Sequence, residues 1–460
     1  MKNLSGAVLV ISLICSITLC AQKHKSLQVS SPDGVITVNI EAGNKLEWSI
    51  KHKGQQVLAP SAIGLQLENG EVLGDDPKVT SSKMEKVKKE ITAINYKKAT
   101  IPDEYNQLTI RLKGDFGVLF RAYNDGVAYR IFTSRKADLV IKNEAVNFNF
   151  AEDHKAFIPF VRDLRGSEIY VNSFEALYKE TNISKINKDT LGFLPLLVDI
   201  GDGKKAAILE ADVENYPGMF VNVNQETRAG LVGEFAPFPL EEKQGGFNML
   251  NLMVTKRADY IAKTRGTRSF PWRAIVISQH DKELLNNDIV QKLAAQPRIA
   301  DVSWIKPGKV AWDWWNNWNI SHVDFRAGIN TPTYKYYIDF AAANKIEYIV
   351  MDEGWSVSTD MTKVSPKIDL DEIVEYGKKK GVGVILWATW YALIQQMDDV
   401  FEKYSKMGVK GFKIDFFDRD DQKVIASTYE IAEKAAKYKL RSTCTVFTSR
   451  RVCSAPTQMW

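Results

Sequence analysis

Residues 27–278 carry short runs in which hydrophobic and polar residues alternate, with Gly, Asn and Asp between the runs. Alternation with a period of two predicts β-strands that bury one face, and many such strands in a row are typical of an antiparallel β-sandwich. The segment Asn124-Asp125-Gly126 predicts a tight hairpin turn, because Asp-Gly readily takes positive φ. The runs are GVITVNI (34–40), KLEWSI (45–50), QLTIRLKG (107–114), VLFRAYNDGVAYRIF (118–132), AAILEAD (206–212) and WRAIVIS (272–278).

A different pattern begins after residue 304, where apolar strands alternate with amphipathic helices. Four β-α units in a row, with nearly continuous apolar strands, predict a parallel sheet covered by helices. A doubly wound fold and a (β/α)8 barrel both fit, and the lack of a Gly-rich phosphate turn after the first strand favours the barrel. We predict strands at 309–315, 347–354, 382–390 and 409–417, and helices at 334–345, 369–380, 392–407 and 422–439.

The two patterns divide the chain into domains. The stretch DKELLNNDIVQKLAAQPRIA (281–300) predicts a helical connector that ends near Pro297. We therefore expect an N-terminal β-sandwich domain at 22–280, a helical linker at 281–308, and the first four β-α units of a barrel at 309–440.

The first 21 residues have the order of a secretory signal peptide. Lys2 is followed by the apolar run AVLVISLICSITLC (7–20) and by the small residue Ala21 before Gln22. We expect export to the periplasm or the exterior, with a mature start near Gln22. Lipidation of Cys20 is the alternative, although Leu19 is a poor fit for the small residue that lipoprotein processing prefers. No later stretch approaches about 18 uninterrupted apolar residues, so we expect no membrane span.

The composition is that of a globular protein: 460 residues, 45% hydrophobic and 25% charged. Lys2 and the three arginines after residue 440 supply four of the five excess positive charges, so the net charge of +5 does not indicate a nucleic-acid partner. Two of the four cysteines lie in the signal peptide and two in the last 20 residues, so the body depends on core burial. The five histidines lack metal-ligand spacing, which argues against a His-based zinc site.

Acidic residues follow the predicted parallel strands, at the end of a barrel where active sites are built. Eight of the eleven tryptophans lie between residues 304 and 390. Aromatic faces pack against the apolar C–H faces of a pyranose while carboxylates accept hydrogen bonds from its hydroxyls, so the pattern predicts a sugar site. Its candidate side chains are Trp312, Trp314, Asp352, Glu353 and Lys413, with Asp415 at the end of the fourth strand.

Structural alternatives stay open for several of these residues. Trp312 and Trp314 alternate along a predicted strand and could belong to the barrel core. Four acidic residues could cap the following helices: Asp352 and Glu353 after the second strand, and Asp420 and Asp421 after the fourth.

Asp415 is harder to explain as a structural residue. It lies inside the apolar run FKIDFF, where an unpaired carboxylate would cost several kcal/mol. Lys413, two positions earlier, faces the same side of the strand and could keep the carboxylate ionised.

At these residues the sequence resembles glycoside hydrolase family 97, in its retaining α-galactosidase-like branch. The resemblance covers nearly all of residues 25–440 and implies an N-terminal β-super-sandwich, a catalytic (β/α)8 barrel and a small C-terminal β-domain. The segments that carry it are FRAYNDGVAYRI (120–131), SFEALY (173–178), WDWWNNWN (312–319), YIVMDEGW (348–355), ILWATW (385–390) and GFKIDFFDRDDQ (411–422).

The resemblance implies that Asp415 is the nucleophile of a double displacement on a terminal α-linked sugar. Retaining members carry Asp at this position, whereas inverting α-glucosidases of the family have Gly there and use glutamates elsewhere. The acid/base Glu of the family falls beyond residue 460. The family also binds Ca²⁺, and Glu175 matches one ligand, while the partner glutamates again fall beyond residue 460. We expect an oligosaccharide or α-galactoside substrate and a monomer.

Residues 441–460 do not match the resemblance. The family continues there with a fifth strand and a motif similar to MVDYHG, whereas this chain has RSTCTVFTSRRVCSAPTQMW. One set of codons for this string, with a single T inserted after its first base, reads MVDMHGVYKPAGLQRTYPNV instead. We therefore expect residues 441–460 to be a frameshifted tail, and the chain to hold only the first half of a barrel.

Two classes of function stay open at this point. The first is an exported retaining exo-α-glycosidase, most simply an α-galactosidase, with an α-glucosidase of the same family as its variant. The second is a non-catalytic carbohydrate-binding remnant of such an enzyme, since the sandwich could fold alone. We expect the 460-residue chain itself to be inactive, because the acid/base residue is not part of it.

Overall fold

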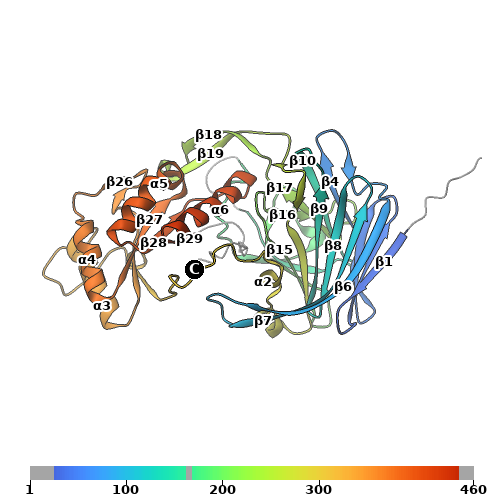
Figure 1. Cartoon of the computed structure of the whole chain (residues 1–460), viewed down its shortest axis with the longest axis horizontal. Coiled ribbons are helices and arrows are strands. Elements are labelled where there is room, and N and C mark those ends of the chain that lie inside the picture. The colour runs from blue at the N-terminus through green and yellow to red at the C-terminus, as the bar shows by residue number, and fades with distance from the viewer. Residues whose placement is uncertain (1–24, 162–167, 445–460) are drawn as a thin grey trace, which may run out of the picture.

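The computed structural model describes residues 25–161 and 168–444 of the chain (Figure 1). The predicted signal peptide, Cys20 and residues 445–460 of the predicted tail lie outside the described residues. Within the described ranges, no helix combines the length and the apolar character needed to cross a membrane. Figure 1 shows the N-terminal strands gathered in one half of the molecule and the helices α3 to α6 in the other half.

The N-terminal half is built from two ten-stranded sheets whose neighbouring strands run antiparallel. The first sheet contains β1 (Lys25–Ser30), β2 (Ile36–Ala42), β3 (Leu46–His52), β4 (Gln55–Leu67), β5 (Val72–Leu73), β10 (Leu139–Asn149), β13 (Gly192–Phe193), β16 (Met219–Val223), β17 (Gly230–Phe235) and β20 (Ala262–Thr264). The second contains β6 (Val79–Thr92), β7 (Thr100–Leu112), β8 (Phe116–Tyr123), β9 (Gly126–Ser134), β11 (Lys155–Pro159), β12 (Tyr178–Asn182), β14 (Leu196–Asp199), β15 (Lys205–Ala211), β21 (Thr267–Ser269) and β22 (Trp272–Ser278).

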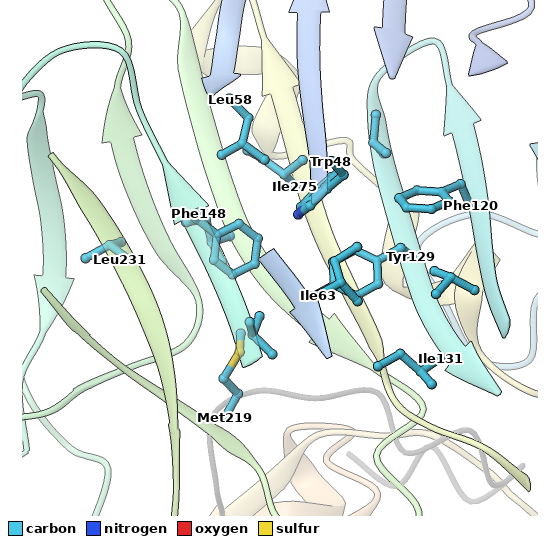
Figure 2. Packing of buried hydrophobic residues seen from close by; sticks show 14 of the residues in the cluster. Trp48, Leu58, Ile63, Phe120, Tyr129, Ile131, Phe148, Met219, Leu231 and Ile275 are labelled. Carbon is cyan, nitrogen blue, oxygen red and sulfur yellow. The ribbon is translucent and has the colours of Figure 1, made fainter. Parts of the chain in front are cut away.

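One hydrophobic core joins these sheets. Alternate residues of the strands point into it, which is why the period-two runs predict them. The ring of Trp48 lies 5.0 Å from that of Tyr129 and 6.2 Å from that of Phe120, and all three are fully buried (Figure 2). Strands of both sheets thus contribute to one core, which gives the N-terminal half an interior of its own.

The hairpin turn lies where the sequence predicts it, but its geometry differs. Tyr123 pairs with Gly126, so Asn124 and Asp125 are the two central residues. Neither Asp125 nor Gly126 has a positive φ, and the expectation of left-handed Asp-Gly was wrong. Gly126 serves a close approach instead: a Cβ on it would lie 2.7 Å from the carbonyl oxygen of Ile275.

The helices of the connector between the two halves are short. They are α1 (Asp281–Leu284), with four residues, and α2 (Ile289–Leu293), with five. Before them, the hairpin of β18 (Pro239–Gly245) and β19 (Asn251–Arg257) forms a separate two-stranded sheet. Two 3-10 turns complete this half, η1 (Ile183–Lys185) and η2 (Phe247–Met249).

The C-terminal half contains a five-stranded parallel sheet in the order β23-β24-β27-β28-β29. Its strands are β23 (Val310–Trp312), β24 (Tyr348–Met351), β27 (Gly383–Thr389), β28 (Gly411–Asp415) and β29 (Arg441–Cys444). The helices between them are α3 (Thr331–Ala343), α4 (Leu370–Lys380), α5 (Trp390–Met407) and α6 (Gln422–Lys437), with the 3-10 turn η3 (Asp313–Asn316) and the hairpin of β25 (Ser356–Val357) and β26 (Asp360–Val364).

This sheet agrees with the predicted β-α order and departs from it at two places. The first strand ends at Trp312 rather than at residue 315, because residues 313–316 turn into η3. A fifth strand, β29, follows the four predicted units and pairs in parallel with β28. The closure of such strands into an eight-stranded barrel stays a prediction.

The two faces of the parallel sheet carry different side chains. Ile349, Leu386 and Ile414 belong to a large buried cluster with residues of all four long helices. Tyr348, Val350 and Ile385 form a small separate cluster, with Trp312 packed against it. Because side chains alternate along each strand, residues two positions apart share the helix-free face, and that face carries the candidate site.

Candidate active site

The carboxyl ends of four parallel strands meet at one edge of the sheet. Trp312 pairs with Val350, and Thr389 pairs with Asp415, so the residues that end or follow these strands lie close together. At the helix-free face of this edge the structure gathers an ammonium group, two carboxylates and an indole ring, from Lys413, Asp352, Asp415 and Trp312.

Lys413 is the centre of this cluster. Its Nζ donates to Asp352 Oδ2 over 2.6 Å, lies 3.5 Å from Asp415 Oδ2, and sits 4.5 Å from the ring centroid of Trp312. The side chain is 9% exposed, so the surrounding protein screens these charges far less than bulk water would. Lys413 and Asp415 share one side of β28, as the alternation predicts, but the ammonium lies closer to Asp352.

Asp415 ends β28 and is held by three neighbours. Its Oδ1 accepts a hydrogen bond from the backbone N–H of Phe416 over 2.9 Å, and its Oδ2 accepts one from the indole Nε1 of Trp387 over 3.3 Å. Lys413 is the third neighbour. The carboxylate is therefore oriented and faces a positive charge, and its side chain keeps 17% of its surface exposed. Trp387 is absent from the residues predicted for the site, although its place two residues before the end of a strand could have indicated it.

Asp352 is almost fully buried, and both of its carboxylate oxygens accept hydrogen bonds. Its Oδ2 accepts from the indole of Trp312 over 2.5 Å as well as from Lys413. Asp369 caps α4, the next long helix, so Asp352 does not act as the helix cap that the sequence left open. Glu353 points elsewhere, since its Oε1 accepts from the hydroxyl of Ser358 over 2.9 Å.

Asp313 lies behind Asp352 and is a residue that the candidate set left out. Both of its carboxylate oxygens accept from the backbone N–H of Asp352, at 3.2 and 3.3 Å, and the residue is 1% exposed. Burial raises the pKa of Asp313 to about 6, against the opposing hydrogen bond from the Asp352 N–H, which favours the charged form. An acidic residue inside the apolar run WDWW was the sequence feature that could have indicated Asp313 as a site residue.

The tryptophans at this edge divide into a buried and an exposed set. Trp312 is half-buried and stacks on Trp314, with centroids 5.4 Å apart and planes 20° apart. Trp314 is 52% exposed and Trp315 is 76% exposed, because both lie in η3 beyond the end of the strand. Trp314 is therefore not part of a core, and the pair presents aromatic surface beside the charged cluster.

A cavity of about 360 Å³ lies on the helix-free face next to this cluster. Its lining includes Trp312 and Tyr348 together with the cationic side chains of Lys306, Lys413 and Arg441, so aromatic surface lies beside positively charged groups. The volume is in the range that proteins use for small-molecule sites. A ring-shaped polyol matches such a lining, which offers flat apolar faces together with a charged hydrogen-bond donor.

The later acidic residues do not join the cluster. Asp418, Asp420 and Asp421 are buried where the loop after β28 contacts the N-terminal half. The side chain of Asp421 accepts from the backbone N–H of Val424 and caps α6, as the sequence analysis suggested.

Glu175 lies on an exposed segment of the N-terminal half. Among the residues that the structure describes, no three His, Cys, Asp or Glu side chains group closely enough to hold a metal ion. Ca²⁺ takes six to eight oxygen ligands. The carboxylate of Glu175 is of the right chemical kind, but the described residues do not form a calcium site by themselves.

Each half of the chain matches a model of the same glycoside hydrolase family. Residues 29–296 match the glycosyl-hydrolase 97 N-terminal model, and residues 314–443 match the glycoside hydrolase 97 model. A retaining alpha-galactosidase of Bacteroides thetaiotaomicron is 44% identical over 445 residues, which are 96% of this chain and 66% of that protein. A probable retaining alpha-galactosidase of Streptomyces bingchenggensis is 24% identical over 428 residues, which are 90% of this chain and 59% of that protein.

Two solved structures are similar in fold. A glycoside hydrolase family 97 enzyme in complex with acarbose, from Pseudoalteromonas sp. strain K8, has a TM-score of 0.77 at 23% identity, over 91% of this chain and 66% of that one. A beta-arabinopyranosidase has a TM-score of 0.77 at 22% identity, over 92% and 67%. The chain thus spans 59–66% of the length of the two curated relatives described above.

Proposed function

The chain belongs to glycoside hydrolase family 97. We propose that it forms part of an exported, retaining exo-α-galactosidase in which Asp415 is the nucleophile. The observation that carries the proposal is the oriented carboxylate of Asp415, at the carboxyl end of a parallel strand beside Lys413, Trp387 and an aromatic cavity. We propose galactose rather than another sugar because the 44% identical relative is a retaining alpha-galactosidase.

The first chemical step is an attack by one Asp415 oxygen on the anomeric carbon. A glycosyl ester forms while the bond from that carbon to the leaving oxygen breaks, and an acid must protonate that oxygen. The Phe416 N–H and the Trp387 Nε1–H fix the plane of the carboxylate. Because the carboxylate is already oriented, little further entropy is lost when the transition state forms. Water then releases the sugar from the ester with its original configuration.

The neighbouring side chains bind and orient the sugar ring. Trp314 and Trp315 offer exposed indole faces for the C–H face of a pyranose. Lys413 can donate a hydrogen bond to a sugar hydroxyl while it compensates Asp352 and Asp415. Trp312, which Lys413 and Trp314 cover, shapes the site from behind rather than stacking on the sugar.

The acid/base residue and the remaining calcium ligands come from the family resemblance, which places them beyond residue 460. The parallel sheet would be the first half of the barrel, and Glu175 would reach a Ca²⁺ ion together with ligands that the described residues do not supply. Export follows the signal pattern at residues 1–21, and we expect a monomer.

The test uses a chain extended in the restored reading frame, with an α-galactoside as substrate. Asp415→Gly should abolish turnover of a substrate with a poor leaving group, and added azide should partly restore it with inverted configuration. Asp371→Gly, at an exposed acidic residue of α4, is the matched control and should keep activity in its folded fraction. Appearance of β-galactose as the first product of the unsubstituted enzyme would refute Asp415 as nucleophile.

A further inference from the structure

The loop that follows Asp415 leaves the parallel sheet and contacts the N-terminal half. The backbone N–H of Asn172 donates to the carbonyl of Asp418 over 2.8 Å, and that of Gly218 donates to the carbonyl of Asp420 over 2.8 Å. The side chain of Asn251 in β19 donates to the carboxylate of Asp418. Residues 416–421 are thus held by segments that lie more than 150 positions earlier in the chain.

Arg419 is the charged centre of this contact and is 1% exposed. Its Nε and Nη2 donate to the two oxygens of Asp421 over 2.8 and 3.0 Å, which is a bidentate pair within the loop. Its Nη1 donates to Oε1 of Glu242 in β18 over 2.6 Å and to the carbonyl of Leu252 in β19 over 2.9 Å. One guanidinium group therefore joins the loop after β28 to the β18–β19 hairpin.

Each carboxylate that Arg419 binds also has a second cation. Arg257 Nη1 lies 3.6 Å from Asp421, and Lys423 pairs with Glu242. Charge compensation alone is therefore redundant at this site. The feature that only Arg419 supplies is the planar fork that spans both partners, a geometry that lysine cannot reproduce.

The backbone between Asp415 and Arg419 depends on such support. Phe416 and Asp418 both have left-handed φ angles, 63° and 47°, a conformation that non-glycine residues keep only where the surroundings impose it. The N–H of Phe416 is also the donor that orients Asp415 Oδ1. A loop that relaxes at residues 416–418 would move this donor and turn the carboxylate.

We propose that Arg419 is a positioning residue, through which the β18–β19 hairpin of the N-terminal half holds Asp415 in its attacking orientation. This inference rests on the proposed function of Asp415. In this proposal the N-terminal half helps to orient the nucleophile for the first chemical step, so that step depends on both halves.

The experiment measures the first step directly, in a chain extended in the restored frame. A 5-fluoro-α-galactosyl fluoride transfers its sugar to the nucleophile without acid catalysis: the anomeric C–F bond breaks, fluoride leaves, and C1 forms an ester with Asp415 while the fluorine at C5 stays on the sugar. Mass spectrometry gives the labelling rate at saturation and the half-saturating concentration. Arg419→Lys and Glu242→Gln should each lower the saturating rate about 10²-fold, the effect expected of a small misplacement of a reacting group, with little change in the half-saturating concentration.

Arg273→Lys is the matched control, because Arg273 is equally buried and pairs with Glu144 and Glu210 inside the N-terminal half. It should lower the melting temperature but leave the labelling rate of the folded fraction unchanged. Unchanged labelling in both Arg419→Lys and Glu242→Gln would overturn the inference, and so would an equal loss in Arg273→Lys. If Asp415→Gly is still labelled, the proposed function fails instead. Arg419→Lys keeps the charge, and Glu242→Gln keeps the pair within the loop, so the test does not depend on one variant folding.

Discussion

Replacing Asp313 with Asn should change how stability depends on pH. Asp313 is buried beneath Asp352, and burial raises the pKa of its carboxyl group from 3.8 to about 6. Asparagine keeps an oxygen that can accept from the Asp352 N–H but carries no titrating proton. The unsubstituted chain and Asp313→Asn therefore differ chiefly in whether residue 313 can bind a proton in the folded state.

The sign follows from the direction of the shift. The folded state binds the proton of Asp313 more tightly than the unfolded state does, so its contribution to stability is complete below about pH 3.8 and is lost as pH rises through about 6. The difference of about two pKa units corresponds to about 3 kcal/mol. The free energy of unfolding of Asp313→Asn, minus that of the unsubstituted chain, should therefore increase by about 3 kcal/mol from pH 3.5 to pH 7.5.

Guanidinium unfolding followed by tryptophan fluorescence is the assay, because eight of the eleven tryptophans lie between residues 304 and 390. Gln395→Ala, at an exposed residue of α5 whose side chain does not titrate, is the control and should show a pH-independent difference from the unsubstituted chain. A pH-independent difference for Asp313→Asn as well would show that the carboxyl group of Asp313 has the same pKa in the folded and unfolded states, and would refute the effect of burial argued here.

Three further outcomes follow from the site. Lys413→Met should lower the free energy of unfolding by about 3–5 kcal/mol, since buried Asp352 loses its cation; unfolding of the exposed-site control Lys410→Met should stay near the unsubstituted value. Trp314→Ala should weaken galactoside binding to residues 22–460 about tenfold without lowering the melting temperature, and calorimetry that finds equal affinity would contradict its role. In the extended chain, a calcium chelator should lower galactoside affinity and the melting temperature, and Glu175→Gln should remove that response; an equal response in Glu175→Gln would exclude it as a ligand.

Local signals explain why the helices of the C-terminal half are predicted well. The predicted helix 369–380 is observed as Leu370–Lys380, because the side chain of Asp369 caps its first turn and Gly381 ends it with a φ of 74°. Both residues are visible in the sequence at the positions where caps are expected. Helix α6 is similar, with Asp421 as its cap.

The first strand shows where a local pattern fails. The letters WDWW continue the apolar run, but the chain turns after Trp312 and Asn317 takes a left-handed φ of 53°. No residue in 313–316 forbids an extended strand. The turn brings Asp313 under Asp352, and that contact, between residues 39 positions apart, has no local signature.

The site residues divide in the same way. Asp415 and Lys413 follow from alternation along one strand, since only backbone geometry is needed to place them together. Trp387 and Arg419 depend on which strands and hairpins become neighbours, and the Arg419–Glu242 pair spans 177 positions. Sequence patterns therefore identify the side chains within an element better than the partners that orient them.

The charges around Lys413 leave negative charge that is only partly compensated at Asp415, the proposed nucleophile. One ammonium group faces two carboxylates and lies closer to Asp352, at 2.6 Å, than to Asp415, at 3.5 Å. Asp352 also receives the indole N–H of Trp312, so the more buried carboxylate is compensated first. Asp415 keeps the weaker ion pair and the more exposed side chain. The same lysine thus stabilises the buried carboxylate strongly and leaves the oxygen of Asp415 more accessible, as the proposed role of a nucleophile requires.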